Sequence, residues 1–138
     1  MQGFVQASSE GKFAYWYDPA TKNYFTYEVA TALIKNITGS IKVTLYDTEN
    51  DEPGYPDPAG VWGWIENDKS ILVNDEYDIW RVDPTGMAQP KNISNSFGRK
   101  SKTGFTYTRL DDEKRNIKED EIILLRSFNK ITKFSGYF

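Results

Sequence analysis

The side chains that most often carry out chemistry in proteins are missing from this chain or lie out of pattern. Among its 138 residues there is no histidine and no cysteine. This removes the usual general base near neutral pH, the commonest metal ligand, thiol nucleophiles and disulfides. An α/β-hydrolase needs Gly-x-Ser-x-Gly to hold its nucleophile, and a histidine to accept the proton. Neither occurs. We therefore predict that this chain alone has no catalytic residue, uses no cofactor and is not an enzyme.

An acidic segment, Asp47-Thr48-Glu49-Asn50-Asp51-Glu52, offers the oxygen ligands that calcium prefers. It lacks the Asp-x-Asp-x-Asp-Gly frame of a calcium loop, and solvated acidic loops are far commoner. We therefore predict no metal site, and whether residues 47–52 bind a cation stays open.

Four tryptophans could form a stacking platform for sugars or bases. They are Trp16, Trp62, Trp64 and Trp80. Each lies inside a run of strand-forming residues, where large aromatic side chains normally belong to the core. Trp62 is the one residue kept as a candidate surface or ligand-contact aromatic. Because it precedes Trp64 by two residues, both are expected on one face of a strand.

The net charge of −3 hides a division along the chain. Residues 1–90 carry 6 basic and 14 acidic side chains, whereas residues 91–138 carry 11 basic and 6 acidic. A basic end can indicate nucleic acid binding. Here the acidic runs 111–113 and 119–121 dilute the field that phosphates would need, so we expect no nucleic acid partner. The chain has no run of eighteen apolar residues, so we expect no membrane span. Residues 1–13 do not resemble a secretory signal.

The elements that position these residues form a repeat. Lys35-Asn36-Ile37-Thr38 nearly recurs as Lys91-Asn92-Ile93-Ser94. Upstream, residues 8–18 can be aligned with residues 65–75. Both segments begin with a polar turn, continue with residues that favour β-strands and end at an aspartate. A second extended run follows each, at residues 24–29 and 77–82. The two Asn-Ile-Thr/Ser triplets are formal glycosylation sequons, but the repeat explains them without any sugar.

A third copy is predicted near the end of the chain, starting at Glu121-Ile122-Ile123-Leu124-Leu125. Its hairpin turn, residues 129–133, is expected to be equivalent to residues 18–23 of the first copy. Each unit is predicted to be headed by a further strand, at residues 3–8, 61–65 and 103–110. No segment shows helical periodicity. Four short antiparallel strands per 40–50 residues, roughly, is typical of a propeller blade.

The predicted fold is therefore all-β: a partial β-propeller of about three four-stranded antiparallel blades in one domain, 1–138. Blade one covers about residues 2–38 and an inter-blade loop covers 39–60. Blade two covers about 61–94, and blade three, which is incomplete, covers about 103–138.

The segment Ser8-Ser9-Glu10-Gly11-Lys12-Phe13-Ala14-Tyr15 resembles the Ser-Pro-Asp-Gly-Lys motif of TolB-type propellers. With YWYDPATKNYFTYEV, DIWRVDPTG and NIS, the chain is similar to the N-terminal propeller of the prolyl oligopeptidase family, especially its dipeptidyl- and acylaminoacyl-peptidase-like members. Ser9 replaces the usual proline, and Glu66-Asn67-Asp68 replaces the second turn, which weakens the choice of subfamily. No adjacent Glu-Glu pair is present, so no substrate-binding residue is carried over.

This resemblance implies a non-catalytic segment that caps a separate serine peptidase domain and filters peptide substrates. It also implies a periplasmic or secreted protein. The rival expectation is a stand-alone TolB-like interaction or ligand-binding module that self-assembles. Its acidic front and basic end predict a head-to-tail homodimer that completes a ring. The expected partner is therefore either a missing C-terminal hydrolase domain or a second copy of the chain.

Overall fold

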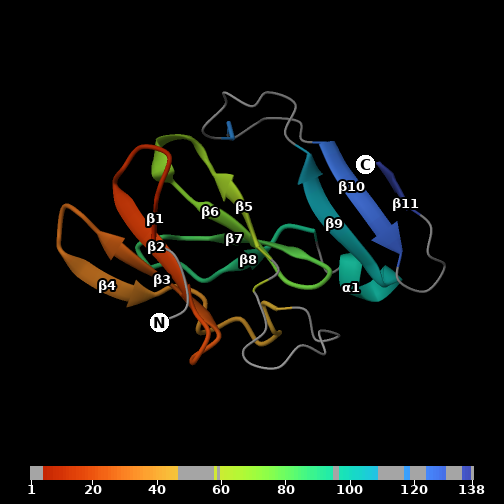
Figure 1. Cartoon of the computed structure of the whole chain (residues 1–138), viewed down its shortest axis with the longest axis horizontal. Helices are drawn as coiled ribbons and strands as arrows, with labels where there is room; N and C mark the ends of the chain where they lie inside the picture. Colours follow the sequence, from red (N-terminus) through yellow and green to blue (C-terminus); the bar gives the residue numbers. More distant parts are fainter. Residues whose placement is uncertain are drawn as a thin grey trace.

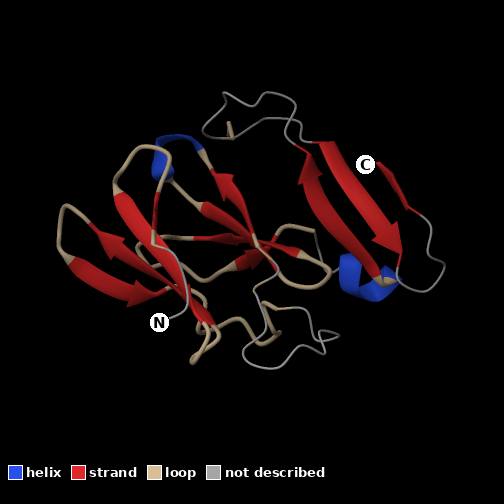
Figure 2. Ribbon diagram, in the orientation of Figure 1, coloured by secondary structure: helices blue, strands red, loops and turns tan. Residues whose placement is uncertain are grey.

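The computed structural model describes residues 5–46, 58, 60–94, 97–108, 117–118, 124–129 and 135–137, and their regular secondary structure is almost entirely β-strand. The strands form three antiparallel sheets that follow one another in chain order (Figures 1 and 2). In these ranges the helical elements are α1 (Phe97–Ser101) and a single 3₁₀ turn, η1 (Glu66–Asp68). The all-β class predicted from the sequence is confirmed.

Sheet 1 contains β1 (Gln6–Ala7), β2 (Phe13–Asp18), β3 (Asn23–Glu28) and β4 (Leu33–Asn36), in the order β1-β2-β3-β4. Aromatic and β-branched residues favour this extended form. The β2–β3 turn is fixed by the Asp18 carboxylate, which accepts hydrogen bonds from the Ala20 N–H and the Thr21 hydroxyl. Neighbouring strands therefore pair as consecutive hairpins.

Sheet 2 repeats this topology with β5 (Val61–Trp64), β6 (Ile71–Asn74), β7 (Ile79–Val82) and β8 (Lys91–Asn92), in the order β5-β6-β7-β8. Ile71, Leu72 and Val73 are at most 2% exposed, so successive side chains are buried on both faces of β6. A run of apolar residues without polar alternation is what a strand covered on both sides requires.

The third sheet contains β9 (Thr103–Thr108), β10 (Leu124–Asn129) and β11 (Ser135–Tyr137). β10 pairs antiparallel with both β9 and β11. The strands that flank the turn predicted at residues 129–133 therefore pair with each other, as expected. Residues 130–133 themselves lie outside the described part of the chain.

Strand registers show that sheets 1 and 2 are equivalent residue by residue over most of their length. Ala14 pairs with Tyr27 in sheet 1, and Ile71, which is 57 residues after Ala14, pairs with Val82 in sheet 2. The repeated Asn-Ile-Thr/Ser endings also match. The Tyr24 N–H donates to Thr38 Oγ1 at 2.9 Å, and the Ile79 N–H donates to Ser94 Oγ at 3.1 Å.

The two sheets differ in the turn that joins their second and third strands. The second run of sheet 2, predicted to begin at Tyr77, begins instead at Ile79. The Asp75 carboxylate accepts the backbone N–H groups of Tyr77 and Asp78, which closes a tighter turn than the one after Asp18. Tyr77 and Asp78 therefore belong to this turn.

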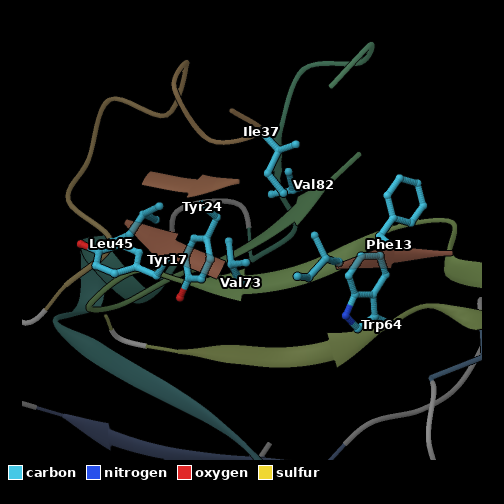
Figure 3. Packing of buried hydrophobic residues seen from close by; sticks show 9 residues of the cluster. Phe13, Tyr17, Tyr24, Ile37, Leu45, Trp64, Val73 and Val82 are labelled. Carbon is cyan, nitrogen blue, oxygen red and sulfur yellow. The ribbon is translucent and has the colours of Figure 1, made fainter. Parts of the chain in front are cut away.

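The main hydrophobic core lies between sheets 1 and 2 (Figure 3). Aromatic side chains of sheet 1 meet aliphatic and indole side chains of sheet 2, and the Phe13 and Trp64 rings stack with centroids 5.8 Å apart. The buried members of this core are Phe13, Tyr17, Tyr24, Ile37, Leu45, Trp64, Ile71, Val73 and Val82. A second cluster, on the other face of sheet 2, contains Trp62, Ile65, Leu72, Ile79 and Ile117. Sheet 2 is thus enclosed on both sides.

Helix α1 was not expected from the sequence, which shows no helical period there. Its first turn is held from outside, because the Asp78 carboxylate accepts the backbone N–H groups of Gly98 and Arg99. A tertiary contact therefore supplies hydrogen-bond acceptors for the first turn of α1. Of the expected loop 39–60, residues 39–46, 58 and 60 are described, and they contain no helix and only a single isolated bridge, between Tyr46 and Pro58.

Candidate functional site

A pocket of about 400 Å³ opens between the first strands of sheets 1 and 2. β1 and its following turn form one wall, β5 forms the other, and Tyr15 of β2 completes the lining. Its residues are Gln6, Ala7, Ser8, Ser9, Tyr15, Val61, Trp62, Gly63 and Trp64. The lining combines two indole rings, a phenol, an amide and two hydroxyls, and it contains no charged side chain.

Trp62, the candidate contact residue from the sequence, lines this pocket but is only 7% exposed. It packs with Leu72 and Ile79, whereas Trp64 packs with Ile71 and Val73. The prediction that Trp62 and Trp64 share one face of the strand is therefore wrong. The reason is a β-bulge, since Val61 pairs with Val73 and Gly63 with Leu72, leaving Trp62 as the extra residue.

Tyr15 presents the polar end of the pocket. Its hydroxyl donates a hydrogen bond to Gln6 Oε1 at 3.0 Å, and its ring lies 5.4 Å from that of Trp64, centroid to centroid. Burial raises the pKa of Tyr15, and the Trp64 side chain partly offsets this effect. The phenol is therefore neutral at physiological pH. The pocket can bind an uncharged polar group against aromatic walls, but it holds no activated nucleophile.

Asp68 fastens the pocket's serine-containing turn to sheet 2. Its carboxylate accepts the hydroxyls of Ser8 and Ser9, at 2.6 and 2.8 Å. It also accepts the backbone N–H groups of Glu10 and Lys12, at 3.0 and 3.2 Å. Burial opposes ionisation, but these hydrogen bonds outweigh it and hold the pKa of Asp68 below its ordinary value. A carboxylate so satisfied is a weak base, so the Ser8–Asp68 contact is a structural link and not a catalytic dyad.

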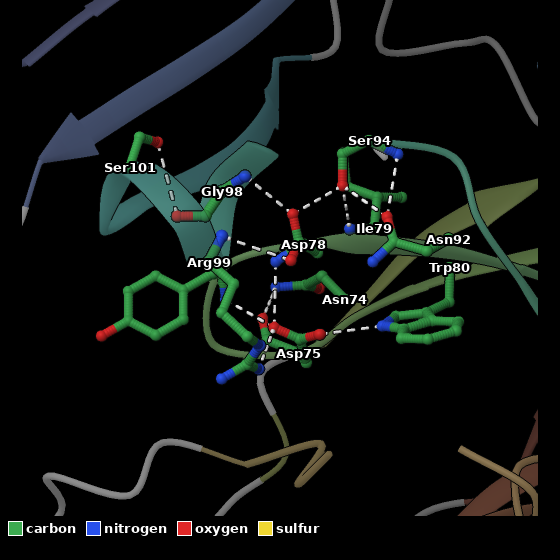
Figure 4. Close-up of polar contacts among 11 residues, drawn as sticks. Asn74, Asp75, Asp78, Ile79, Trp80, Asn92, Ser94, Gly98, Arg99 and Ser101 are labelled. Carbon is green, nitrogen blue, oxygen red and sulfur yellow. Dashed lines mark hydrogen bonds and ion pairs between the residues drawn. The ribbon is translucent and has the colours of Figure 1, made fainter. Parts of the chain in front are cut away.

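A second polar centre joins sheet 2 to helix α1 (Figure 4). Asp75 and Asp78 are each 1% exposed. Asp75 accepts the Trp80 indole N–H at 2.8 Å and contacts Arg99 Nη2 at 3.3 Å. Asp78 accepts the Ser94 hydroxyl at 2.8 Å in addition to the helix N–H groups. Buried carboxylates require such partners, and backbone N–H groups, an indole, a hydroxyl and a guanidinium supply them here.

Sequence reasoning missed Asp68, Asp75 and Asp78 as organising residues. Asp68 stands in Glu66-Asn67-Asp68, which was taken only as a departure from the repeat motif. The available signal was positional, because Asp75 lies at the repeat equivalent of the turn residue Asp18. No local pattern reveals that Asp68 reaches back across about 60 residues to Ser8.

The described residues hold no group of three or more acidic side chains placed to bind a metal ion. The acidic segment 47–52 lies outside the part of the chain that the structure describes. Where helix is described, none is long and apolar enough to cross a membrane. No family profile, curated protein or solved structure matches this chain.

Proposed function

We propose that this chain is a non-catalytic β-propeller segment of a prolyl-oligopeptidase-family serine peptidase, where it caps the hydrolase domain and filters peptide substrates. The observation that carries the proposal is the equivalence of sheets 1 and 2 in topology and register. Successive up-and-down sheets packed face to face are the construction principle of a propeller. The motifs that resemble this peptidase family lie on those equivalent strands.

The position of the pocket supports a substrate-filtering role. It lies where the first strands of two successive sheets approach, and in a propeller the first strands of the blades surround the central channel. Aromatic rings with a few polar groups are suited to a peptide, since the rings accept apolar side chains and the Tyr15 and Gln6 groups can meet a peptide amide. The segment would then select substrates while the chemistry takes place in another domain.

The test is the natural reading frame that contains this segment. We expect further four-stranded units and a Gly-x-Ser-x-Gly with a distant histidine in the same protein. The protein made from that frame should hydrolyse chromogenic dipeptide or acyl-amino-acid substrates and be blocked by a serine-directed inhibitor. The 138-residue chain alone should be inactive in the same assay. A frame without a nucleophile motif, or inhibitor-sensitive turnover by the chain alone, would contradict the proposal.

A second candidate function is a stand-alone TolB-like module that binds a partner or a ligand and assembles with itself. One observation favours it, namely an aromatic face of sheet 1 that is only partly covered among the described residues. This candidate requires no hydrolase domain. A reading frame that stops without a nucleophile motif, together with stable self-association, would support it over the peptidase segment.

A further inference from the structure

The three hydroxyl groups that line the pocket between β1 and β5 already donate their protons to acceptors within the protein. Ser8 and Ser9 donate to the Asp68 carboxylate. Tyr15 donates to Gln6 Oε1. Each of these hydroxyl oxygens can therefore meet a ligand only as an acceptor. Because Ser8 is only 5% exposed, Ser9 and Tyr15 present the more accessible oxygens.

Few hydrogen-bond donors remain on the pocket surface. The Trp64 indole nitrogen is buried without a hydrogen-bond partner, so its N–H does not reach that surface. Gln6 keeps the N–H groups of its side-chain amide, and this residue is exposed. The described lining residues include no lysine and no arginine. A ligand that brings its own donors is therefore favoured over one that brings acceptors.

Asp68 places a negative charge behind the two serines. The residue is 3% exposed, and all four groups that donate to its carboxylate are uncharged. Lys12, on the same turn, donates its ammonium group to the Asn67 carbonyl oxygen at 3.3 Å. A cation that contacts the Ser9 hydroxyl would lie within about 6 Å of the Asp68 carboxylate, because two successive hydrogen bonds of about 2.8 Å join them. At this distance a carboxylate stabilises an opposite charge.

The rest of the lining suits a long carbon chain that ends in a cation. Ala7 and Val61 supply aliphatic surface, and Tyr15, Trp62 and Trp64 supply aromatic rings. Lysine and arginine pack their methylene groups on apolar surface while the charged end stays among polar atoms. Aromatic rings also attract a cation that lies over their faces. The volume of about 400 Å³ lies within the range of ligand pockets.

We propose that the pocket between β1 and β5 binds the lysine or arginine side chain of a peptide, with the charged group at Ser9 and Tyr15 and the carbon chain against Val61. The choice of a peptide rests on the proposed function. The choice of a cationic side chain rests on the oriented hydroxyls and on Asp68. An uncharged donor satisfies the same oxygens but gains little from the carboxylate charge. The pocket would thus select substrates by their charge.

The test is a titration of the 138-residue chain with three peptides at low salt, followed by tryptophan fluorescence, since Trp62 and Trp64 line the pocket. The peptides are acetyl-Ala-Lys-Ala-amide and its arginine and norleucine equivalents. Blocked ends remove every other charge, and norleucine keeps the lysine carbon chain without the ammonium group. The lysine and arginine peptides should bind about two- to fivefold more tightly than the norleucine peptide. An ionic strength of about 1 M should remove most of this difference.

Gln6 offers a matched pair of variants at an exposed position. Gln6→Glu keeps an oxygen for the Tyr15 hydroxyl, removes the amide donors and adds a negative charge. It should tighten binding of the lysine peptide about two- to fivefold, and Gln6→Lys should weaken it by a similar factor. Met87→Glu and Met87→Lys change a residue that is 89% exposed and outside the pocket lining, and they should leave binding unchanged. Circular dichroism confirms that each variant is folded.

Three results would overturn the inference. They are equal affinity for the lysine and norleucine peptides, binding of none of the three peptides, and unchanged affinity for the lysine peptide in a folded Gln6→Lys variant. All three leave the peptidase-segment proposal intact, because that proposal is tested by the reading frame and by peptidase activity. A reading frame without a nucleophile motif, in turn, would leave a measured charge preference of the pocket in place.

Discussion

At the scale of single residues, Asp68 is the main polar connection between the first two sheets. Its carboxylate accepts four hydrogen bonds within the protein, two from hydroxyls and two from backbone N–H groups. Its backbone is left-handed, with φ of 54°, as is that of Asn67, with φ of 63°. Asparagine and aspartate tolerate this conformation better than most residues. One residue thus satisfies both the turn geometry and the contact between the sheets.

Asp68→Asn should lower the free energy of unfolding by about 2 kcal/mol, because hydrogen bonds to a charged, buried acceptor are lost while the left-handed backbone is kept. Urea unfolding at neutral pH measures this change. Because the folded-state pKa is below the ordinary 3.8, the contribution of Asp68 is fully present above about pH 4 and is lost as pH falls through the lowered pKa. The variant should therefore show a shallower loss of stability on acidification.

Asp18→Asn is the matched control, since Asp18 accepts hydrogen bonds only within its own exposed turn. It should cost less than about 1 kcal/mol, as surface substitutions usually do. Equal losses for the two variants would show that Asp68 does not link the sheets as described.

Tyr17 should make the protein sensitive to alkaline pH. Burial raises its pKa to about 12, and negative charge on Tyr46 and Asp18 adds to the effect. A raised pKa means that this contribution is fully present below the ordinary value of 10.0 and is lost as pH rises to about 12. Unfolding experiments should show stability falling across that interval, and Tyr17→Phe should reduce the fall.

At neutral pH, Tyr17→Phe should be within about 1 kcal/mol of the wild type, because the Tyr17 hydroxyl is buried without a hydrogen-bond partner among the described residues. A large loss of stability at pH 7 would mean that the hydroxyl makes a contact that this account lacks.

At the scale of elements, the same interaction holds the end of the fourth strand to the third strand in both four-stranded sheets: a Thr or Ser hydroxyl accepts a backbone N–H of the third strand. The Thr38 hydroxyl accepts the Tyr24 N–H and donates to Asn23 Oδ1, and the Ser94 hydroxyl accepts the Ile79 N–H and donates to Asp78 Oδ1. The hydroxyl therefore caps the third strand just beyond the last pair of the ladder. This explains why the Asn-Ile-Thr/Ser endings recur in the sequence.

Thr38→Val should destabilise the protein by about 1–3 kcal/mol, because it leaves the Tyr24 N–H and Asn23 without their partner in a buried site. Thr38→Ser keeps the hydroxyl and should cost less. The midpoints of urea unfolding compare the two directly. If valine proves as good as serine at this position, the hydroxyl is not what holds the strand.

Gly98→Ala should disturb the packing of helix α1 against Tyr77, Asp78 and Thr103. A Cβ at this position would clash with the Tyr77 carbonyl oxygen and would lie 2.8 Å from both Asp78 Oδ1 and the Thr103 carbonyl oxygen. The helix would have to shift from Asp78, exposing a buried carboxylate, and we expect a loss of about 2–4 kcal/mol. Gly86→Ala is the comparison, where the nearest atom is Lys35 Cβ at 3.7 Å, an ordinary van der Waals contact. Its cost comes only from the positive φ and should be about 1 kcal/mol. Thermal unfolding distinguishes the two variants.

The sequence is informative about elements because strand periods and turn residues are local properties. The sequence therefore predicts the repeat, the all-β class and the equivalence of Asn-Ile-Thr in the first unit with Asn-Ile-Ser in the second. It fails where a distant residue decides the outcome. The bulge that separates Trp62 from Trp64, the Asp68 contact with Ser8, and the capping of α1 by Asp78 each depend on atoms far along the chain. The exposure of Trp62 was likewise decided by packing against Leu72 and Ile79.

At the scale of the whole molecule, sheets 1 and 2 pack face to face around the main hydrophobic core, and each of them has a second face that can be covered. Sheet 2 is complete in this sense, because hydrophobic clusters cover both of its faces. Sheet 1 has one such cover among the described residues, and its other face bears the stacked Trp16 and Phe25 rings. In the proposed propeller, each added sheet would contribute to stability, and the outermost apolar faces would favour closure into a ring.

The propeller is the central claim, and an experimental structure of the protein in its natural reading frame tests it most directly. We expect sheets 1, 2 and 3 to be arranged around one axis with β1, β5 and β9 innermost. We also expect the face of sheet 1 that bears Trp16 and Phe25 to be covered by another sheet of the same repeat. Two results would contradict the propeller. One is a third sheet that lies away from the axis shared by sheets 1 and 2. The other is a Trp16–Phe25 face that is covered by a helix or left exposed to solvent.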